Sequence, residues 1–132
     1  MNYYSTNNKN LKVSFEETLF SGMPLDNGLY MPESIPNLTS YFLDNSISFQ
    51  EISYEIAAKF ISNELSSSNI SDIIDSSITF RAPNKNINDN VFCLELFHGP
   101  TLAFKDFGAR FMARCMEKFI KNKDKKLNIL VA

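Results

Sequence analysis

One stretch of the chain has the apolar spacing of an amphipathic helix. Ser48 and Glu51 form a capping box, in which the serine side chain accepts from a free amide at the helix start and the glutamate reaches back. Apolar side chains then recur every three or four residues, which places them on one face. They are Phe49, Ile52, Ile56 and Phe60. The pattern predicts a helix over residues 49–63, broken by the polar cluster at residues 66–69.

Two shorter helices are expected around this one. Ser14 and Glu17 form a second capping box, which predicts a helix over residues 15–21, and Gly22 supplies a left-handed stop. After the polar cluster, isoleucines again recur at helical spacing, and Asp72 is favourably placed near the positive end of that helix. These isoleucines are Ile70, Ile73, Ile74 and Ile78.

A turn and a short strand complete this part of the chain. Residues 26–28, Asp-Asn-Gly, tolerate positive φ and precede the apolar residues 29–31, which we expect to form a strand that Pro32 ends. With the helices, these features predict a small, mostly helical N-terminal module over residues 1–82. The polar residues that follow include a proline and five turn-prone side chains, four Asn and one Asp, so a linker is expected at residues 83–90.

Beyond the linker the apolar pattern changes. Residues 91–96 and 127–132 have the pattern of strands, and apolar residues between them recur every three or four positions. The recurring residues are Phe104, Phe107, Phe111, Cys115 and Phe119. This order predicts one β-α-β unit, parallel and right-handed. The predicted fold class is therefore α/β, with α+β character in the N-terminal module, and residues 91–132 are expected to begin a second domain.

Composition and charge narrow the classes of function. A chain of 132 residues with 44% hydrophobic and 21% charged residues is typical of a soluble globular domain. The net charge of -2 and the pI near 5.4 provide no basic field, so neither nucleic acid nor a membrane surface is expected as a partner. Because the chain has no charged start followed by an apolar stretch and no apolar run near about 20 residues, we expect a cytoplasmic protein.

The metal-binding residue types are sparse. His98 is the single histidine, and Cys93 and Cys115 lie far apart with no CxxC spacing. No zinc pattern is recognisable, and no metal site is expected. Both cysteines are expected to be buried small hydrophobic residues.

Lys105 is the main candidate for chemistry. Residues 97–108 leave a strand, turn through Gly-Pro and begin a helix, so Lys105 falls in the first helical turn. The unpaired amides there create a positive field that opposes an ammonium group. The same field, with Phe104 and Phe107 on either side, would favour the neutral amine and free it for attack on a carbonyl. Many lysines near helix starts simply point into solvent, so position alone leaves both interpretations open.

The residues around Lys105 resemble those of a known family. Residues 94–110, Leu-Glu-Leu-Phe-His-Gly-Pro-Thr-Leu-Ala-Phe-Lys-Asp-Phe-Gly-Ala-Arg, closely resemble the pyridoxal phosphate lysine segment of threonine synthases. Residues 4–6, 13–15 and 26–32 are similar to the N-terminal region of that family. One departure lies in the turn, where relatives commonly show Asp-Gly-Gly and this chain has Asn27, which tolerates the left-handed region.

The resemblance implies a fold type II pyridoxal phosphate enzyme that converts O-phospho-L-homoserine to L-threonine and phosphate by β,γ-elimination and hydration. Lys105 would hold the cofactor covalently and then, as a free amine, move protons at the substrate carbons. By the same resemblance, the glycine-rich phosphate loop, the hydroxyl partner of the pyridine nitrogen and most of the substrate site would follow Ala132. We therefore expect residues 1–132 to be an inactive fragment of the enzyme, with little stable cofactor binding.

Other residues of the same run are open to two interpretations each. His98 would contact substrate or pack at the turn, and Thr101 would offer its hydroxyl to substrate or cofactor, or cap the helix. Asp106 suits the helix dipole at the start of the helix. Arg110 and Arg114 are expected to form surface ion pairs rather than to bind phosphate.

Two alternatives compete with the fragment hypothesis. One is a non-catalytic interaction module of the same fold, which binds a protein through apolar surface. The other is a pyridoxal phosphate lyase of the same fold that acts on a different phosphorylated substrate. Both an enzyme fragment and an interaction module should expose part of the Phe-rich helix face, so self-association is expected under either hypothesis.

Overall fold

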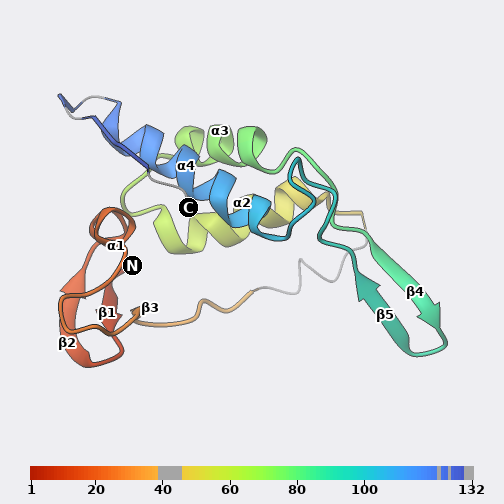
Figure 1. The fold of residues 1–132 in the computed structure, drawn as a ribbon, viewed down its shortest axis with the longest axis horizontal. Coiled ribbons are helices and arrows are strands. Elements are labelled where there is room, and N and C mark those ends of the chain that lie inside the picture. The colour runs from red at the N-terminus through yellow and green to blue at the C-terminus, as the bar shows by residue number, and fades with distance from the viewer. Residues whose placement is uncertain (39–45, 122, 125, 130–132) are drawn as a thin grey trace.

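The computed structural model describes residues 1–38, 46–121, 123–124 and 126–129. In these residues four helices and five strands form two small antiparallel sheets and a helical body, a mixed α/β arrangement (Figure 1). The elements are β1 (Tyr3–Ser5), β2 (Asn8–Val13), α1 (Phe15–Ser21), β3 (Tyr30–Pro32), α2 (Phe49–Ile61), α3 (Ser67–Ser77), β4 (Asn84–Asn88), β5 (Val91–Leu94) and α4 (Lys105–Ile120). None of the helices in the described ranges has the length and apolar character needed to cross a membrane.

The N-terminal sheet has the strand order β2-β1-β3, with both pairings antiparallel. Strand β3 confirms the strand expected after the turn, and Pro32 occupies its last position, opposite Tyr3. Strands β1 and β2 were not predicted, because β2 is largely polar and β1 has only three residues. The central strand buries Tyr3, and burial, followed by the nearby Glu64 charge, raises the pKa of that phenol to about 12.

The turn before β3 packs directly on β1. The fully buried Ser5 hydroxyl donates to Asp26 Oδ1 at 2.7 Å, and this bond, then the Gly28 amide, lowers the pKa of Asp26. Asn27 takes the positive φ expected of it, at 61°. A Cβ on Gly28 would lie 2.2 Å from Ser5 Oγ, so this position has room only for glycine. The turn is thus built by close approach to β1 as well as by its own backbone preferences.

The three helices predicted before residue 82 all form, and two of them have the caps that the sequence predicted. Both capping boxes are present, at the starts of α1 and α2, and Gly22 ends α1 with φ 69°. Helix α2 ends at Ile61, two residues before the predicted end, because the chain turns there to bring Leu65 into the core. The polar cluster at 66–69 starts α3 rather than only separating two helices: Ser66 is the N-cap and accepts from the Asn69 amide.

The core lies where α2, α3 and α4 meet, and α1 packs against α4 (Figure 1). Its buried residues are Ala57, Ile61, Leu65, Ile70, Ile73, Ile74, Ile78 and Cys115. Burial raises the pKa of the Cys115 thiol to about 12, so it stays neutral, as expected of a small hydrophobic residue. The prediction that Cys93 is buried is wrong. Cys93 is exposed on β5, because the partner strand β4 pairs with the edge of β5 and leaves its faces uncovered.

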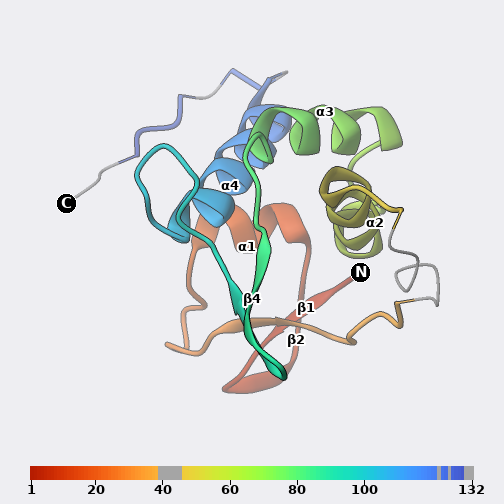
Figure 2. The ribbon, with the colours of Figure 1, turned by 90° about the vertical axis from the view of Figure 1, so that its right-hand side faces the viewer.

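The hairpin of β4 and β5 corrects one expectation. Residues 84–88 form a strand inside the segment predicted as a linker, because backbone hydrogen bonds need no apolar side chains and Asp89-Asn90 suits a tight turn. Strand β5 pairs antiparallel with β4, a partner that the sequence did not predict. The hairpin projects from the helical body (Figure 1), and Figure 2 looks at the molecule from its side. The division into two domains at this point stays a prediction.

The predicted strand at 127–132 is the remaining part of the β-α-β unit. Residues 127–129 are described and lie in no strand, while residues 130–132 lie outside the described part of the chain. A strand forms only where a neighbouring strand accepts its backbone hydrogen bonds, and residues 127–129 have no such neighbour among the described residues. Strand β5 and helix α4 are the two elements of the unit that the described residues contain.

Candidate functional site

Lys105 is the first residue of α4, as the sequence predicted. The N-cap position is Phe104, whose backbone is already helical and whose side chain makes no capping hydrogen bond. The Lys105 side chain is exposed, and within the described ranges no hydrogen bond or ion pair engages its amine. The amine therefore stands at the start of α4, unpaired among the described residues.

An open, apolar hollow of about 600 Å³ lies next to Lys105. Its lining comes from the first two turns of α4 and from both ends of the segment between β5 and α4. It consists of Leu96, Phe104, Lys105, Phe107, Gly108, Ala109 and Met112. The lysine is the one charged side chain of this lining. A planar, largely apolar group would find contact area here, beside an amine.

The loop before Lys105 is tied to the residue after it. Thr101 donates twice to the Asp106 carboxylate, from its amide to Oδ2 at 2.8 Å and from its hydroxyl to Oδ1 at 2.7 Å. The Thr101 hydroxyl thus has a partner within the chain, and its predicted role toward substrate or cofactor stays a prediction. Asp106 sits in the first turn, as the dipole argument expected, but its carboxylate faces the loop. The sequence analysis did not predict this pairing. A threonine five residues before an aspartate, on either side of a helix start, is the pattern that could have indicated it.

His98 lies at the beginning of the same loop and pairs with a carboxylate. Its Nε2 is 2.7 Å from Glu95 Oε2, and its ring lies 4.7 Å, centroid to centroid, from that of Phe97. The histidine side chain keeps 31% of its surface exposed. This geometry describes packing at the turn, and a contact with substrate stays a prediction.

The two arginines of α4 have different roles. Arg114 forms the surface ion pair that was expected, with Glu117 at 2.8 Å. The surface ion pair predicted for Arg110 is wrong. Its guanidinium donates to the carbonyls of Ser76 and Ser77, at 3.1 and 3.0 Å. Carbonyls at the C-terminal end of a helix lack partners within it, so a cation there is favourable. Arg110 therefore fastens α4 to the end of α3.

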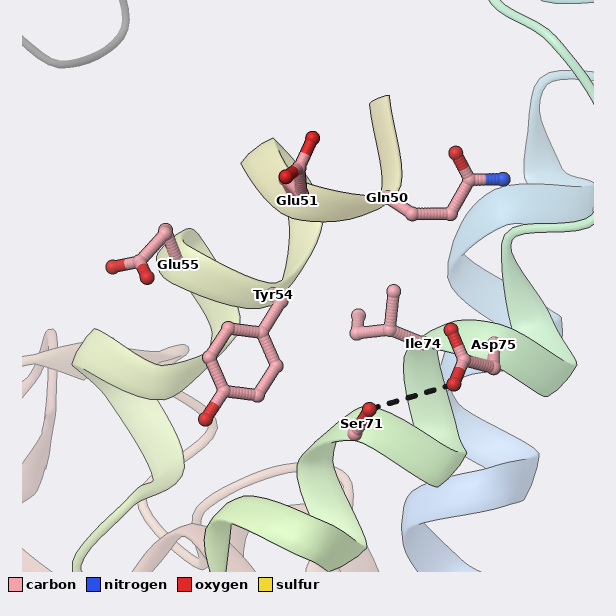
Figure 3. Close-up of a pocket in the computed structure, with 7 residues that line it drawn as sticks. All are labelled: Gln50, Glu51, Tyr54, Glu55, Ser71, Ile74 and Asp75. Atoms are coloured by element: carbon pink, nitrogen blue, oxygen red, sulfur yellow. Dashed lines mark hydrogen bonds between the residues drawn. The ribbon is translucent and has the colours of Figure 1, made fainter. Parts of the chain in front are cut away.

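A second hollow lies between α2 and α3 (Figure 3). Its lining includes three carboxylates, Glu51, Glu55 and Asp75. Glu51 accepts from the Ser48 amide in the capping box, and Asp75 accepts from Ser71 at 3.4 Å. No group of histidine, cysteine and acidic side chains in the described residues is arranged to hold a metal ion. This hollow carries no residue of the predicted site.

The chain is similar to threonine synthases over its whole length. The family described as "Threonine synthase N terminus" matches residues 2–78. The threonine synthase of Haemophilus influenzae is 37% identical over 132 residues, and that of Escherichia coli K12 is 36% identical over 134. Each alignment covers 100% of this chain and 31% of the relative, so the chain spans less than a third of these relatives' length.

Two solved structures have the same fold over most of this chain. The crystal structure of threonine synthase from Escherichia coli has a TM-score of 0.82 at 36% identity, covering 89% of this chain and 28% of that one. The structure of pyridoxal phosphate-bound threonine synthase from Brucella melitensis has a TM-score of 0.85 at 30% identity, covering 96% of this chain and 29% of that one. The similarity thus extends through the helix that begins with the candidate lysine.

Proposed function

Because this chain belongs to the threonine synthase family, we propose that it contributes the cofactor lysine, Lys105, to an enzyme that makes L-threonine and phosphate from O-phospho-L-homoserine and water. The observation that carries the proposal is the position of Lys105, at the first residue of α4 and beside the apolar hollow. The activity is proposed for an enzyme of the family's full length. Residues 1–132 span 31% of the relatives and are proposed to be inactive by themselves.

The residues around Lys105 fit pyridoxal phosphate in two respects. The Lys105 side chain is exposed and unpaired within the described residues, so its amine is accessible to an aldehyde. The adjoining hollow, with Phe104, Phe107 and Met112, offers apolar contacts to an aromatic ring. Lys105 would hold the cofactor. When bound, the cofactor supplies an electron sink for charge that develops at the substrate Cα.

In the proposed reaction Lys105 acts twice. Its amine would hold the cofactor, and it would also move protons at the substrate. As a free amine it would remove one proton each from the substrate Cα and Cβ, so that phosphate leaves from Cγ, and it would return one proton to Cγ and one to Cα as water adds at Cβ.

The test uses the enzyme of full family length that contains this chain. We expect incubation with pyridoxal phosphate and reduction with borohydride to leave a covalent adduct on Lys105, mapped by mass spectrometry. Lys105→Arg should abolish the adduct and lower phosphate release from O-phospho-L-homoserine by about 1000-fold. Lys121→Arg is the matched control, since it changes a lysine at the opposite end of α4, and it should change neither.

The other outcomes of this test identify the alternatives. An enzyme with the Lys105 adduct that releases phosphate only from a different phosphorylated amino acid would be a related lyase. A protein with no adduct on Lys105 would be a non-catalytic binding module, an alternative supported by the exposed apolar side chains of Phe97, Leu102 and Phe104. Either result contradicts the proposed function.

A further inference from the structure

The carboxylate of Asp106 is one of the few polar groups that the fold buries. Asp106 keeps 7% of its surface exposed, and both carboxylate oxygens accept from Thr101. Burial of a carboxylate is unfavourable unless hydrogen bonds compensate for the lost solvent. The two bonds close a loop of the chain from residue 101 to residue 106, and Lys105 is one of the residues of that loop.

Gly99 brings a second part of the loop against the same carboxylate. Gly99 is buried, and a Cβ at this position would lie 2.3 Å from Asp106 Oδ2 and 2.7 Å from Asp106 Cβ. Real Cβ atoms do not make contacts that short, so position 99 admits only glycine while the Asp106 carboxylate stays in place. The loop therefore packs tightly on Asp106, and this packing requires a glycine at position 99.

Leu102 indicates that the loop is held in a shape it would not adopt alone. Its φ is 60°, a left-handed conformation that is unfavourable for a residue with a branched side chain. The leucine side chain is 74% exposed, so its own packing does not impose this conformation. The bonds that flank it do: the Leu102 amide donates to the Gly99 carbonyl at 3.1 Å, and Thr101 is bound to Asp106. Backbone strain persists where surrounding contacts determine it.

Helix α4 also lacks the usual device that defines a helix start. Its N-cap residue, Phe104, has no oxygen on its side chain and makes no capping bond. The amides of Asp106 and Phe107 instead donate to the carbonyls of Ala103 and Phe104 in tight turns, at 3.1 and 3.4 Å. The position of the first helical residue therefore depends on the loop that leads into it, and that loop depends on Asp106.

We propose that Asp106 is a positioning residue, whose two partly buried hydrogen bonds to Thr101 fix the strained loop at 99–104 and so set the direction in which Lys105 leaves the helix. Successive residues of a helix point about 100° apart, so the Asp106 carboxylate turns toward the loop while Lys105 is left on the side of the apolar hollow. The inference rests on the proposed function, because it assigns Asp106 a role through the proposed cofactor lysine.

The test compares variants at both ends of the bond pair in the enzyme of full family length. Asp106→Ala removes both acceptors and should lower kcat by about 100-fold, the effect of a misplaced reacting group, with KM for O-phospho-L-homoserine changed by less than about 3-fold. Thr101→Val loses only the hydroxyl bond and should lower kcat by about 10-fold. Thr101→Ser keeps both donors and should restore kcat to within about 2-fold of the wild type.

Two readouts do not depend on turnover. The Asp106→Ala enzyme should form the borohydride-trapped adduct on Lys105 at least about 10-fold more slowly, and its Thr101 amide should exchange hydrogen faster, because its acceptor is gone. Glu117→Gln, which removes an exposed carboxylate from the same helix, should change neither readout. Ile73→Val, a small core substitution away from the loop, measures what a general loss of stability does to kcat and adduct formation.

The outcomes separate this inference from the function on which it rests. An adduct on Lys105 of the wild type, with Asp106→Ala altering kcat and adduct formation no more than Ile73→Val does, overturns the positioning role and leaves the proposed function standing. The same holds if Thr101→Ser is as impaired as Thr101→Val. Absence of the adduct from the wild type overturns the proposed function itself.

Discussion

At the scale of single residues, the start of α1 is capped both by a neighbour in sequence and by a side chain distant in sequence. The Ser14 hydroxyl accepts from the third amide of α1, as its capping box predicts. The first two amides, of Phe15 and Glu16, donate to the two oxygens of Glu64, at 2.7 and 2.9 Å. Glu64 lies 49 residues from Phe15, so this cap exists only in the folded chain. It joins α1 to the turn between α2 and α3.

Glu64→Gln should therefore lower the free energy of unfolding by about 1–2 kcal/mol, since an amide side chain offers one acceptor to two donors and carries no charge. Chemical denaturation of the chain measures this difference. Glu55→Gln is the matched control, because this glutamate of α2 caps no helix start, and it should change the free energy of unfolding by less than about 0.5 kcal/mol. Equal losses in both variants would contradict the capping role of Glu64.

At the scale of elements, helices were predictable because their signals are local. The residues of both capping boxes lie three positions apart, and the isoleucines of α3 repeat within one helix face. The strands lacked such signals. Strand β2 reads Asn-Lys-Asn-Leu-Lys-Val and β4 reads Asn-Lys-Asn-Ile-Asn, and each forms because a partner strand satisfies its backbone. Strand pairing depends on the neighbour, which a segment's own composition does not specify.

Ser48→Ala tests the capping of α2. It removes the acceptor of the Glu51 amide and should cost about 1 kcal/mol of stability, lowering the melting temperature followed by circular dichroism. Ser53→Ala changes the same residue type inside the same helix, where the serine hydroxyl bonds only to the Phe49 carbonyl. Alanine has the higher helix propensity, so this control should be neutral or slightly stabilising. A melting temperature unaffected by Ser48→Ala would refute the cap.

At the scale of the whole molecule, apolar surface gathers on the hairpin and on the loop that carries the site. Strand β5 and the following loop expose large side chains to at least half of their surface, namely Val91, Phe92, Leu94, Phe97, Leu102 and Phe104. The helical core covers none of these faces in the described residues. Exposed apolar surface of this kind favours association.

Residues 1–132 should accordingly self-associate as concentration rises, and Phe92→Ser combined with Phe104→Ser should weaken that association by at least about 10-fold. Sedimentation velocity across a concentration series measures the effect. Leu25→Ser combined with Met23→Ser serves as control, since it removes exposed apolar surface from the N-terminal module instead. A monomer at every concentration, or an equal effect of both pairs, would contradict association through the hairpin and loop.

The sequence by itself determined the helices with their caps, the turn at Asn27 and the start of a helix at Lys105, because each depends on residues a few positions apart. Only the tertiary structure decided the antiparallel hairpin, the attachment of Arg110 to α3 and the cap from Glu64, which depend on segments brought together by folding. The Asp106 pairing stands between these cases: its partners lie close in sequence, but burial in the folded loop selects that bond over the alternatives open to an exposed aspartate.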